Sequence, residues 1–439
     1  MRAASKRMHQ RQAPQTYYTC ENRSFHKMRI AFIRFLACSL FALSLLAGPA
    51  VVSDPSQTGL NPEALARIPP RMKEFVDQGT VAGVVTLVAR HGNVAALDAV
   101  GYTDIETEQA LRTDAIFQLH SMTKPVVSIA IMMLMEQGKL AITDPVQKHL
   151  PEFRGMWVIA EKSGEQGAER MTLKRPARPI SIRDLLTHTS GMPLNPAPGI
   201  GELHGALHKT LNETVLVMSQ QPLGFEPGSR WQYSNTGMAA LARIIEVRSG
   251  MAFEKFLESQ IFEPLGMDDT FIYPPKEKFH RMPTAYILRD GKPVKYTDDP
   301  LGEGVMKFRV GAKYPLPEGG LYSTASDLFL LYQMMLNGGE YGGDRILSPA
   351  SVELMTQVHT GNLATSGAGM GWGLGWSVVR EPGALGLPSV GTYGHGGRYG
   401  TFCFIDPKKD IIGIFLIHRE GGSDERNAFV QLAMTAARD

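Results

Sequence analysis

Cysteine is almost missing from this chain of 439 residues. Only Cys20, Cys38 and Cys403 occur, and the first two lie within the first 50 residues. The rest of the chain therefore forms no internal disulfide, even in an oxidising compartment. Cys403 stands between two phenylalanines, which predicts a strand residue that packs as a small hydrophobe.

An excess of either charge is also missing. The formal net charge is +2, but the first 50 residues hold eight Lys and Arg against one acid. The remainder holds 37 basic and 42 acidic residues and is mildly acidic. This balance lacks the basic footprint of nucleic-acid binding proteins, so no nucleic-acid partner is expected. With 43% hydrophobic and 20% charged residues, the composition is that of a globular protein and excludes general disorder.

Long apolar runs are absent except at residues 35–47. Lys27, Arg29 and Arg34 precede this run, and small residues lead from it to Ala50. A charged start, a short apolar core and a small-residue exit are typical of a secretory signal. The run is shorter than the roughly 20 residues that a membrane-spanning helix needs. We expect a 1–50 leader with a signal peptide at 28–50, no stable membrane span after cleavage, and a periplasmic or secreted protein.

Hydrophobic periodicity changes along the chain. Strand patterns occupy 81–89, 94–102, 371–379, 401–405 and 411–418, and helical patterns follow Ser121 and cover 181–187, 236–249, 325–336 and 427–437. Two stretches rich in charge, Pro and Gly, 160–180 and 274–318, indicate surface loops. Strands at both ends with helices between them predict an α/β fold, with an antiparallel sheet flanked by helices. The expected domains are a sheet domain from 51–145 and 319–439, and a mostly helical insertion at 146–318.

The first chemical signal is Ser121-Met122-Thr123-Lys124 at the start of a predicted helix. The spacing puts Lys124 one turn beyond Ser121, on the same helix face. A serine hydroxyl is a weak nucleophile until a neighbouring base takes its proton. The helix N-terminus also offers free backbone N–H groups to a developing oxyanion. The same S-x-x-K spacing occurs at Ser24 in the leader, so the pattern alone is weak evidence.

Two further triplets strengthen the evidence from the Ser121–Lys124 pattern. Tyr233-Ser234-Asn235 follows a Pro-Gly loop, and His395-Gly396-Gly397 lies among the C-terminal strand patterns. A phenolate can act as a base, an amide can orient a partner, and glycines let a substrate approach the backbone. Taken singly, each triplet is also explained by ordinary packing. Their occurrence together and in this order favours an acyl-transfer site.

The competing patterns are incomplete. No serine completes the G-x-S-x-G of a lipase-type α/β-hydrolase. His204 and His208 have the i, i+4 spacing of a metal pair but lack the adjacent glutamate of H-E-x-x-H. We expect no metal and no cofactor, because a serine acyl-enzyme route needs neither. A non-catalytic scaffold with a retained fold is the alternative from another class.

With these motifs in place, the sequence resembles the serine β-lactamase-related superfamily of penicillin-recognising hydrolases, and especially family VIII carboxylesterases and class C β-lactamases. Segments 185–192 (LLTHTSGM), 225–235 (FEPGSRWQYSN) and 319–328 (GGLYSTASDL) resemble family segments as well. Together with the triplets, these segments carry the resemblance over roughly residues 65–435, which is most of the chain after the leader.

The resemblance implies an acyl-enzyme at Ser121. Lys124 and Tyr233 accept its proton, Asn235 holds Lys124 or a substrate amide, and the backbone N–H groups of Ser121 and Arg398 form the oxyanion hole. Tyr233 then activates water for deacylation. We expect Lys124, and His395 if it is protonated, to lower the pKa of Tyr233.

The substrate preference is predicted from a motif at which this chain differs from the β-lactamases of the superfamily. β-Lactamases of the superfamily usually carry K-T-G where this chain has His395-Gly396-Gly397. Gly396 brings no hydroxyl and His395 no permanent charge to grip a carboxylate. We therefore expect carboxylic ester hydrolysis, ahead of β-lactam hydrolysis, D-amino-acid peptide cleavage or acyl transfer. The partner is a small ester or amide, and the oligomeric state is left open.

The remaining expectations concern aromatic and histidine side chains near these motifs. Gly396, Gly397 and Tyr322 are expected to contact the substrate. We interpret His188 as structural and expect Trp372 to be a core or sheet-face residue.

Overall fold

The structure is a computed structural model that describes residues 49–52, 54–164, 170–196, 207–296, 308–421 and 423–438. The predicted leader lies almost entirely outside the described residues. The segment Pro49–Asp439 forms one compact unit. The division into a sheet domain and a helical insertion stays a prediction. None of the described helices combines the length and the apolar character that crossing a bilayer requires.

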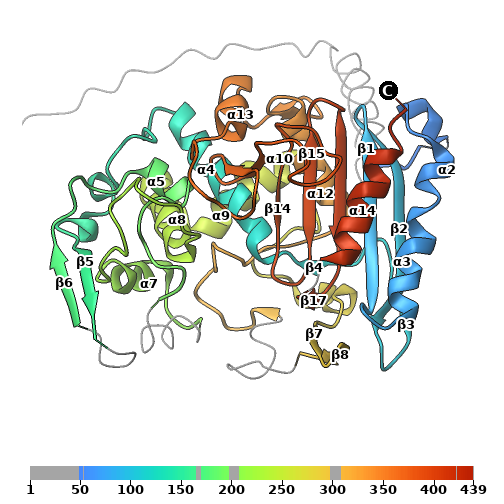
Figure 1. Ribbon diagram of the computed structural model, residues 1–439, viewed down its shortest axis with the longest axis horizontal. Helices are drawn as coiled ribbons and strands as arrows, with labels where there is room; N and C mark the ends of the chain where they lie inside the picture. The colour runs from blue at the N-terminus through green and yellow to red at the C-terminus, as the bar shows by residue number, and fades with distance from the viewer. Residues whose placement is uncertain are drawn as a thin grey trace, which may run out of the picture. The chain divides into compact units, whose positions relative to one another are not determined.

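A large antiparallel sheet dominates the unit (Figure 1). Its strand order is β12-β13-β14-β15-β16-β1-β2-β3, so strands from the two ends of the described chain share one sheet, as the strand patterns predicted. The bounds are Gly83–Arg90 (β1), Asn93–Asp104 (β2), Gln109–Ala110 (β3), Met370–Trp372 (β12), Ser377–Val379 (β13), Tyr393–Gly396 (β14), Phe402–Asp406 (β15) and Ile411–Leu416 (β16).

Strands from the N-terminal and C-terminal parts of the described chain pair near the centre of this sheet. β1 pairs with β16 from Val85 opposite Leu416 to Arg90 opposite Ile411. Leu60 and Ala437 also form an antiparallel bridge outside the strands. The α/β class with a sheet built from both ends is therefore confirmed.

Helices cover both faces of the sheet. Figure 1 shows α2, α3 and α14 packed beside one another over one face of the sheet, and α12 contacts β16 and β1 from the side of the other core. The helix bounds are Pro62–Leu65 (α2), Ile68–Asp77 (α3), Thr123–Glu136 (α4), Ile182–Leu186 (α5), Leu211–Met218 (α7), Asn235–Ser249 (α8), Phe253–Leu257 (α9), Glu263–Leu265 (α10), Ala325–Leu336 (α12), Pro349–Thr356 (α13) and Asp424–Thr435 (α14).

Strand alternation separates two hydrophobic cores. Cys403 and Ile405 of β15 face the larger core, which contains α4, α8 and α12. Phe402 and Phe404 of the same strand face the smaller core beside α3 and α14. Successive strand residues point to opposite faces, so one strand supplies both cores. Cys403 is fully buried, as its flanking phenylalanines predicted.

Three local predictions differ from the structure. The expected strand 371–379 is a hairpin of β12 and β13, because Gly375 takes a φ of 83° and turns the chain. An added Cβ at Gly375 would lie 2.0 Å from Ser128 Oγ, so α4 and this turn touch closely. The two expected loop regions instead contain short hairpins. These hairpins are Val158–Ser163 (β5) with Arg170–Lys174 (β6), and Tyr286–Arg289 (β7) with Lys292–Lys295 (β8).

The remaining elements are short. Two-residue strands are Phe117–Gln118 (β4), Tyr322–Ser323 (β9), Glu340–Tyr341 (β10), Asp344–Arg345 (β11) and Arg419–Glu420 (β17). β4 pairs with β9 just before the predicted nucleophile, so the segment 319–328 lies beside the start of α4.

Candidate active site

Ser121 and Lys124 lie at the start of α4. Ser121 is in a tight 3₁₀ turn, His120–Met122, that leads directly into the helix. One helical turn separates the two side chains, and Lys124 Nζ lies 3.0 Å from Ser121 Oγ. The predicted juxtaposition of hydroxyl and amine is therefore present.

Lys124 is completely buried. Its Nζ donates to the backbone carbonyl of Glu318 at 2.7 Å, just before β9. Burial disfavours the ammonium and lowers the pKa of Lys124 to about 7, although the Glu318 carboxylate acts in the opposite direction. Near neutral pH, a large fraction of Lys124 is a neutral amine with a lone pair beside the serine hydroxyl.

The residue before the serine has a strained backbone. His120 has a φ of 46°, in the left-handed region that side chains other than glycine seldom adopt. Its carbonyl accepts a hydrogen bond from Thr123 Oγ1 at 2.7 Å, and its ring packs edge-on against Tyr399 with centroids 4.2 Å apart. These contacts hold the turn that presents Ser121.

Tyr233 comes from the loop before α8 and reaches the same point. Its ring lies 4.7 Å from Lys124 Nζ, and its hydroxyl lies near enough to Ser121 for that serine to favour the phenolate. Burial nevertheless raises the pKa of Tyr233 well above its usual range and outweighs the effect of Ser121. The expected lowering is therefore wrong, because desolvation of a phenolate dominates at this depth.

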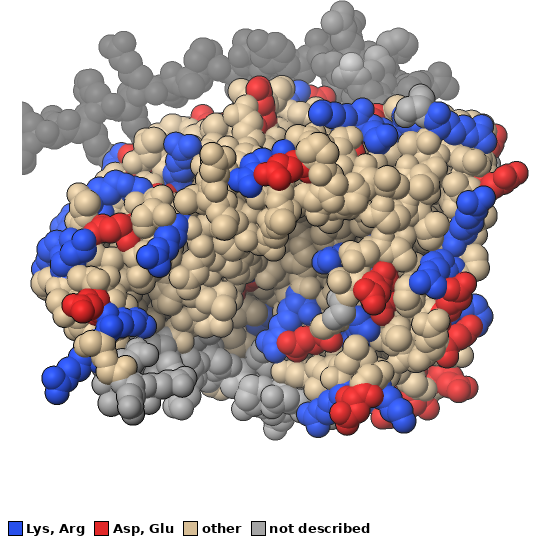
Figure 2. Space-filling view, in the orientation of Figure 1, with Lys and Arg blue, Asp and Glu red and all other residues tan. Residues whose placement is uncertain are grey.

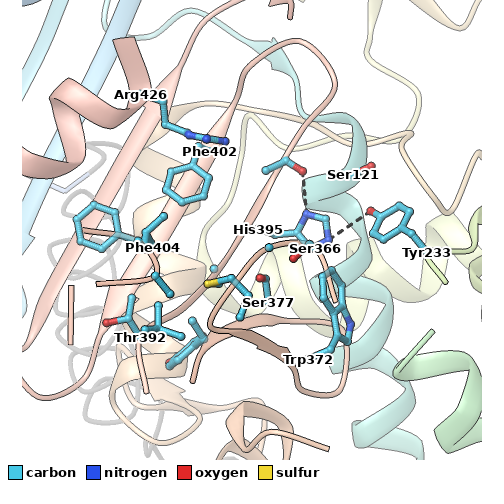
Figure 3. Close-up of a pocket in the computed structure, with 18 residues that line it drawn as sticks. Ser121, Tyr233, Ser366, Trp372, Ser377, Thr392, His395, Phe402, Phe404 and Arg426 are labelled. Atoms are coloured by element: carbon cyan, nitrogen blue, oxygen red, sulfur yellow. Dashed lines mark hydrogen bonds between the residues drawn. The ribbon is translucent and has the colours of Figure 1, made fainter. Parts of the chain in front are cut away.

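His395, on β14, faces Tyr233 (Figure 3). Its Nδ1 donates to the carbonyl of Gly396 at 2.8 Å, which leaves Nε2 as an acceptor 3.4 Å from the Tyr233 hydroxyl. Burial and the nearby Lys124 lower the pKa of His395 to about 3. His395 is thus neutral at physiological pH and supplies no positive charge to Tyr233.

An aromatic cluster supports Tyr233. The His188 ring lies 4.4 Å from the Tyr233 ring and 5.0 Å from that of Trp372, measured between centroids. His188 Nδ1 accepts the backbone N–H of Ser234 at 3.2 Å, so it fixes the residue that follows Tyr233. Trp372 is almost fully buried, as expected, but it also contacts His395 at a centroid distance of 5.6 Å.

The glycines after His395 have different roles. A Cβ at Gly397 would lie 2.3 Å from the carbonyl oxygen of Leu119, two residues before the nucleophile. Gly397 therefore lets β14 approach the nucleophile turn, whereas a Cβ at Gly396 would meet nothing closer than 3.6 Å. The Arg398 side chain is exposed and pairs with Glu420 at 3.0 Å. The oxyanion role of its backbone N–H stays a prediction.

Two predicted residues are placed differently. Asn235 Nδ2 donates to Asn195 Oδ1 at 2.8 Å, and no hydrogen bond joins Asn235 to Lys124 within the described residues. Tyr322 is 1% exposed, and its hydroxyl accepts from Gln118 Nε2 at 3.1 Å. Its ring belongs to a small separate core, because pairing of β9 with β4 turns it away from the cavity. Tyr322 is therefore corrected to a structural residue.

A cavity of about 420 Å³ opens at these groups, and Ser121, Tyr233 and His395 lie at one end of it. Figure 2 shows a hollow near the middle of the face in view, with Lys and Arg side chains near it. The other end of the cavity, with Leu385 and Arg426, was not predicted from the sequence.

Glu318 was also missed. Its backbone carbonyl holds Lys124, and its carboxylate accepts from Tyr314 at 3.0 Å. The position of Glu318 directly before the family-like segment 319–328 was the signal in the sequence that was available.

A metal centre finds no support in the part of the chain that the structure describes. No group of three or more His, Cys, Asp or Glu side chains is placed there to hold an ion. Of the histidine pair noted in the sequence, His204 lies outside the described residues.

The site combines a buried amine next to a serine hydroxyl, a phenol beside both, and an open cavity. This arrangement is that of a serine hydrolase of the Ser-x-x-Lys type. The family model described as Beta-lactamase matches residues 70–436, and the chain belongs to that family.

Relatives and solved structures agree with this assignment. The chain is 30% identical over 382 residues to Esterase EstB of Burkholderia gladioli, covering 80% of this chain and 90% of EstB. It is 26% identical over 419 residues to a protein of Escherichia coli K12 that is named provisionally as a D-alanyl-D-alanine carboxypeptidase, with 90% and 91% covered. The solved structure of EstCE1, a hydrolase with promiscuous acyltransferase activity, superposes with a TM-score of 0.72 at 29% identity, covering 86% of this chain and 99% of EstCE1.

Proposed function

We propose that the protein hydrolyses carboxylic esters through an acyl-enzyme at Ser121, as a family VIII-like carboxylesterase. The observation that carries the proposal is the buried Lys124 amine, 3.0 Å from Ser121 Oγ and with a pKa of about 7. A base with a pKa near the working pH combines the right protonation state with sufficient basicity.

During acylation, protons move from Ser121 to Lys124 and from Tyr233 to the departing alcohol. Neutral Lys124 takes the proton of Ser121 Oγ while the oxygen attacks the ester carbonyl, and Lys124 keeps its hydrogen bond to the Glu318 carbonyl. Tyr233 remains a phenol and hands its proton to the departing alkoxide as the C–O bond breaks. Lys124 then reprotonates Tyr233. The alcohol thus leaves with the proton that Tyr233 held, and the proton lost by Ser121 replaces it on Tyr233.

Deacylation reverses the roles. Water takes the place of the alcohol beside Tyr233, loses its proton through Tyr233 to Lys124, and attacks the acyl carbon. Ser121 Oγ then leaves with that proton. In the resting site the Tyr233 hydroxyl donates to neutral His395, whose Nε2 lies 3.4 Å away, and it turns from Nε2 towards the reacting oxygen when it passes its proton. We assign the oxyanion hole to the backbone N–H groups of Ser121 and Arg398.

The strand triplet favours esters over lactams. His395 is neutral and Gly396 has no hydroxyl, so neither offers a substrate carboxylate the charge-assisted contacts of a K-T-G strand. Arg398, the cation two residues after that strand, is paired with Glu420. Similarity to an esterase adds support.

A substrate panel tests the proposal. We expect turnover of p-nitrophenyl acetate to exceed that of a chromogenic cephalosporin and of a D-Ala-D-Ala peptide. A fluorophosphonate probe should label Ser121, and S121A should lose both the label and the esterase activity. Fast cephalosporin turnover without ester turnover would instead assign a β-lactamase. A wild-type protein without label and without turnover would leave a non-catalytic protein with this fold.

We also propose export, on the basis of the leader pattern alone. N-terminal sequencing of protein purified from a periplasmic or culture fraction should show a start at residue 51. A start at the leader in a cytoplasmic fraction would overturn this proposal.

A further inference from the structure

The cavity that begins at Ser121 does not end at the reacting groups. From Tyr233 and His395 it continues to Thr392, Phe404 and Arg426 at the opposite side (Figure 3), and Leu385 is among the residues that line it. Its volume of about 420 Å³ lies in the range of roughly 300–1,000 Å³ that ligand pockets occupy. This extension is much larger than the attacking serine and a water molecule require.

The extension exists because two strand positions carry no side chain. Gly394 and Gly396 of β14 face the side away from His395, as alternation along a strand requires. Phe404 and Phe402 stand opposite them on β15 and form the floor of the groove. With a rise of roughly 3.3 Å per residue, the stretch from Gly396 at the end of β14 back to Thr392, just before it, spans about 13 Å.

The walls of the cavity carry more apolar than polar surface. Val379, Leu385 and Phe404 supply apolar side chains, and Ser377 and Thr392 add hydroxyl groups. Arg426 of α14 lies with its guanidinium carbon 5.0 Å from the centre of the Phe402 ring. A positive charge at this point disfavours a cationic occupant. An uncharged hydrocarbon chain fits the shape and the chemistry of the groove.

We propose that this groove binds the alcohol part of the ester as an extended alkyl chain of up to about ten carbons, given C–C bonds of roughly 1.5 Å that advance by about 1.25 Å each. The inference rests on the proposed ester hydrolysis and adds the substrate class: acyl esters of medium-chain alcohols.

The alcohol part is assigned to the groove by the proton donor. The departing oxygen takes a proton from Tyr233, so this oxygen lies on the side of Ser121 where Tyr233 and His395 stand. These two residues form the entrance to the groove. A chain attached to the departing oxygen therefore continues into the groove, whereas the acyl chain diverges from it at the tetrahedral carbon.

Two ester series test the assignment. In the first, alkyl acetates from ethyl to dodecyl are followed by acid release at constant pH. We expect kcat/KM to rise by about fourfold for each methylene that is buried, and to level off near ten carbons. In the second, p-nitrophenyl esters with acyl chains of two to twelve carbons keep one leaving group, and this series should show no comparable rise.

Variants locate the chain. In G396V the new side chain projects towards Phe402 without a backbone clash, so it narrows the entrance. Gly394 is unsuitable, because a Cβ there would lie 2.1 Å from the carbonyl oxygen of Cys403. L385W fills the far end, and L387W is its matched control two residues along, where the side chain is 50% exposed.

The outcomes separate the two proposals. We expect L385W to lower the decyl-to-ethyl ratio of kcat/KM at least tenfold, G396V to lower this ratio further, and L387W to leave it unchanged. A flat alcohol series with wild-type p-nitrophenyl acetate turnover overturns the groove assignment and keeps the esterase. A Leu385-dependent rise in the acyl series places the acyl chain in the groove and also overturns it. If the wild-type protein shows neither fluorophosphonate labelling nor turnover of any ester, the proposed esterase activity itself is wrong.

Discussion

The two walls of the active site contribute different things. The wall at the start of α4 carries the reactive pair, a hydroxyl and an amine 3.0 Å apart, and burial sets the protonation state of the amine. The wall formed by β14 carries a neutral imidazole and glycines, which set distance and shape. Reactivity and fit are therefore separable, and substitutions on the two walls should have different signatures.

The largest effect is expected on the reactive wall. K124M should lower kcat/KM at least 10³-fold, because no other amine touches Ser121 Oγ among the described residues. The same change should raise the free energy of unfolding by about 0.5–2 kcal/mol at pH 6, since it removes a buried ionisable group. Ester kinetics and urea unfolding measure the two effects.

The stability gain has a defined pH dependence. The pKa of Lys124 is about 7 in the folded state, below its value in the unfolded chain. Between about pH 7 and 10 the unfolded state binds more protons, so wild-type stability rises with pH in this window. The advantage of K124M should shrink towards pH 9. K148M, at an exposed lysine, is the matched control, and an equal gain there would contradict the interpretation.

Tyr233 lies between the two walls, and its substitution should have the second-largest effect on activity. Y233F keeps the ring and removes the hydroxyl that relays protons, so we expect kcat to fall about 10²–10³-fold. The acid limb of the pH profile should not move, because Lys124 titrates there. Activity close to wild type would remove Tyr233 from the proton path.

On the strand wall, neighbouring glycines should respond differently. G397A forces a Cβ against the Leu119 carbonyl and should displace the nucleophile turn, with a loss of about 1–3 kcal/mol of stability and most of the activity. G396A meets only ordinary contacts and should lose less than about 1 kcal/mol. Thermal unfolding of the pair, together with p-nitrophenyl acetate kinetics, tests whether shape is set at Gly397. Equal losses would contradict this.

The pH profile tests which wall titrates. The pKa of Lys124 is about 7 and that of His395 about 3. Since the neutral amine is the active form, kcat/KM should rise with pH and level off above about 7, with roughly tenfold loss for each pH unit below it. A midpoint near 3 would move the titrating group to the strand wall.

The smallest effect is expected at His188, which touches neither serine nor lysine through a hydrogen bond in the described part of the chain. Its Nδ1 accepts the Ser234 N–H, and its backbone has a φ of 58°. Asparagine tolerates this backbone and offers an acceptor, so H188N should stay within about threefold of wild type, whereas H188L should lose about tenfold in kcat. Identical losses would indicate that only ring packing matters.

The sequence predicts the reactive wall well, because Ser121 and Lys124 lie in one helical turn and local spacing alone brings them together. It also predicts that strands from both ends share a sheet. It misses what depends on depth: the pKa of Tyr233 is raised rather than lowered, since burial by His188 and Trp372 comes from segments far away in the chain.

The directions in which strand side chains point were equally hard to predict from the sequence. Tyr322 was expected to contact the substrate, but its position on β9 directs its ring into a separate core. The groove along Gly394 and Gly396 requires the register of β14 against β15, which no local pattern encodes.

The pairing of β1 with β16 and the bridge between Leu60 and Ala437 have a practical consequence for engineering. The segments around Asn61 and Ala436 lie side by side, with the N–H of Asn61 donating to the carbonyl of Ala436 at 2.7 Å. In a chain trimmed to these segments a short peptide can therefore join them, and new termini can be opened at the exposed turn between β7 and β8. Such a circular permutant would keep the central strands covalently continuous and would make the enzyme a suitable host for inserted sensor domains.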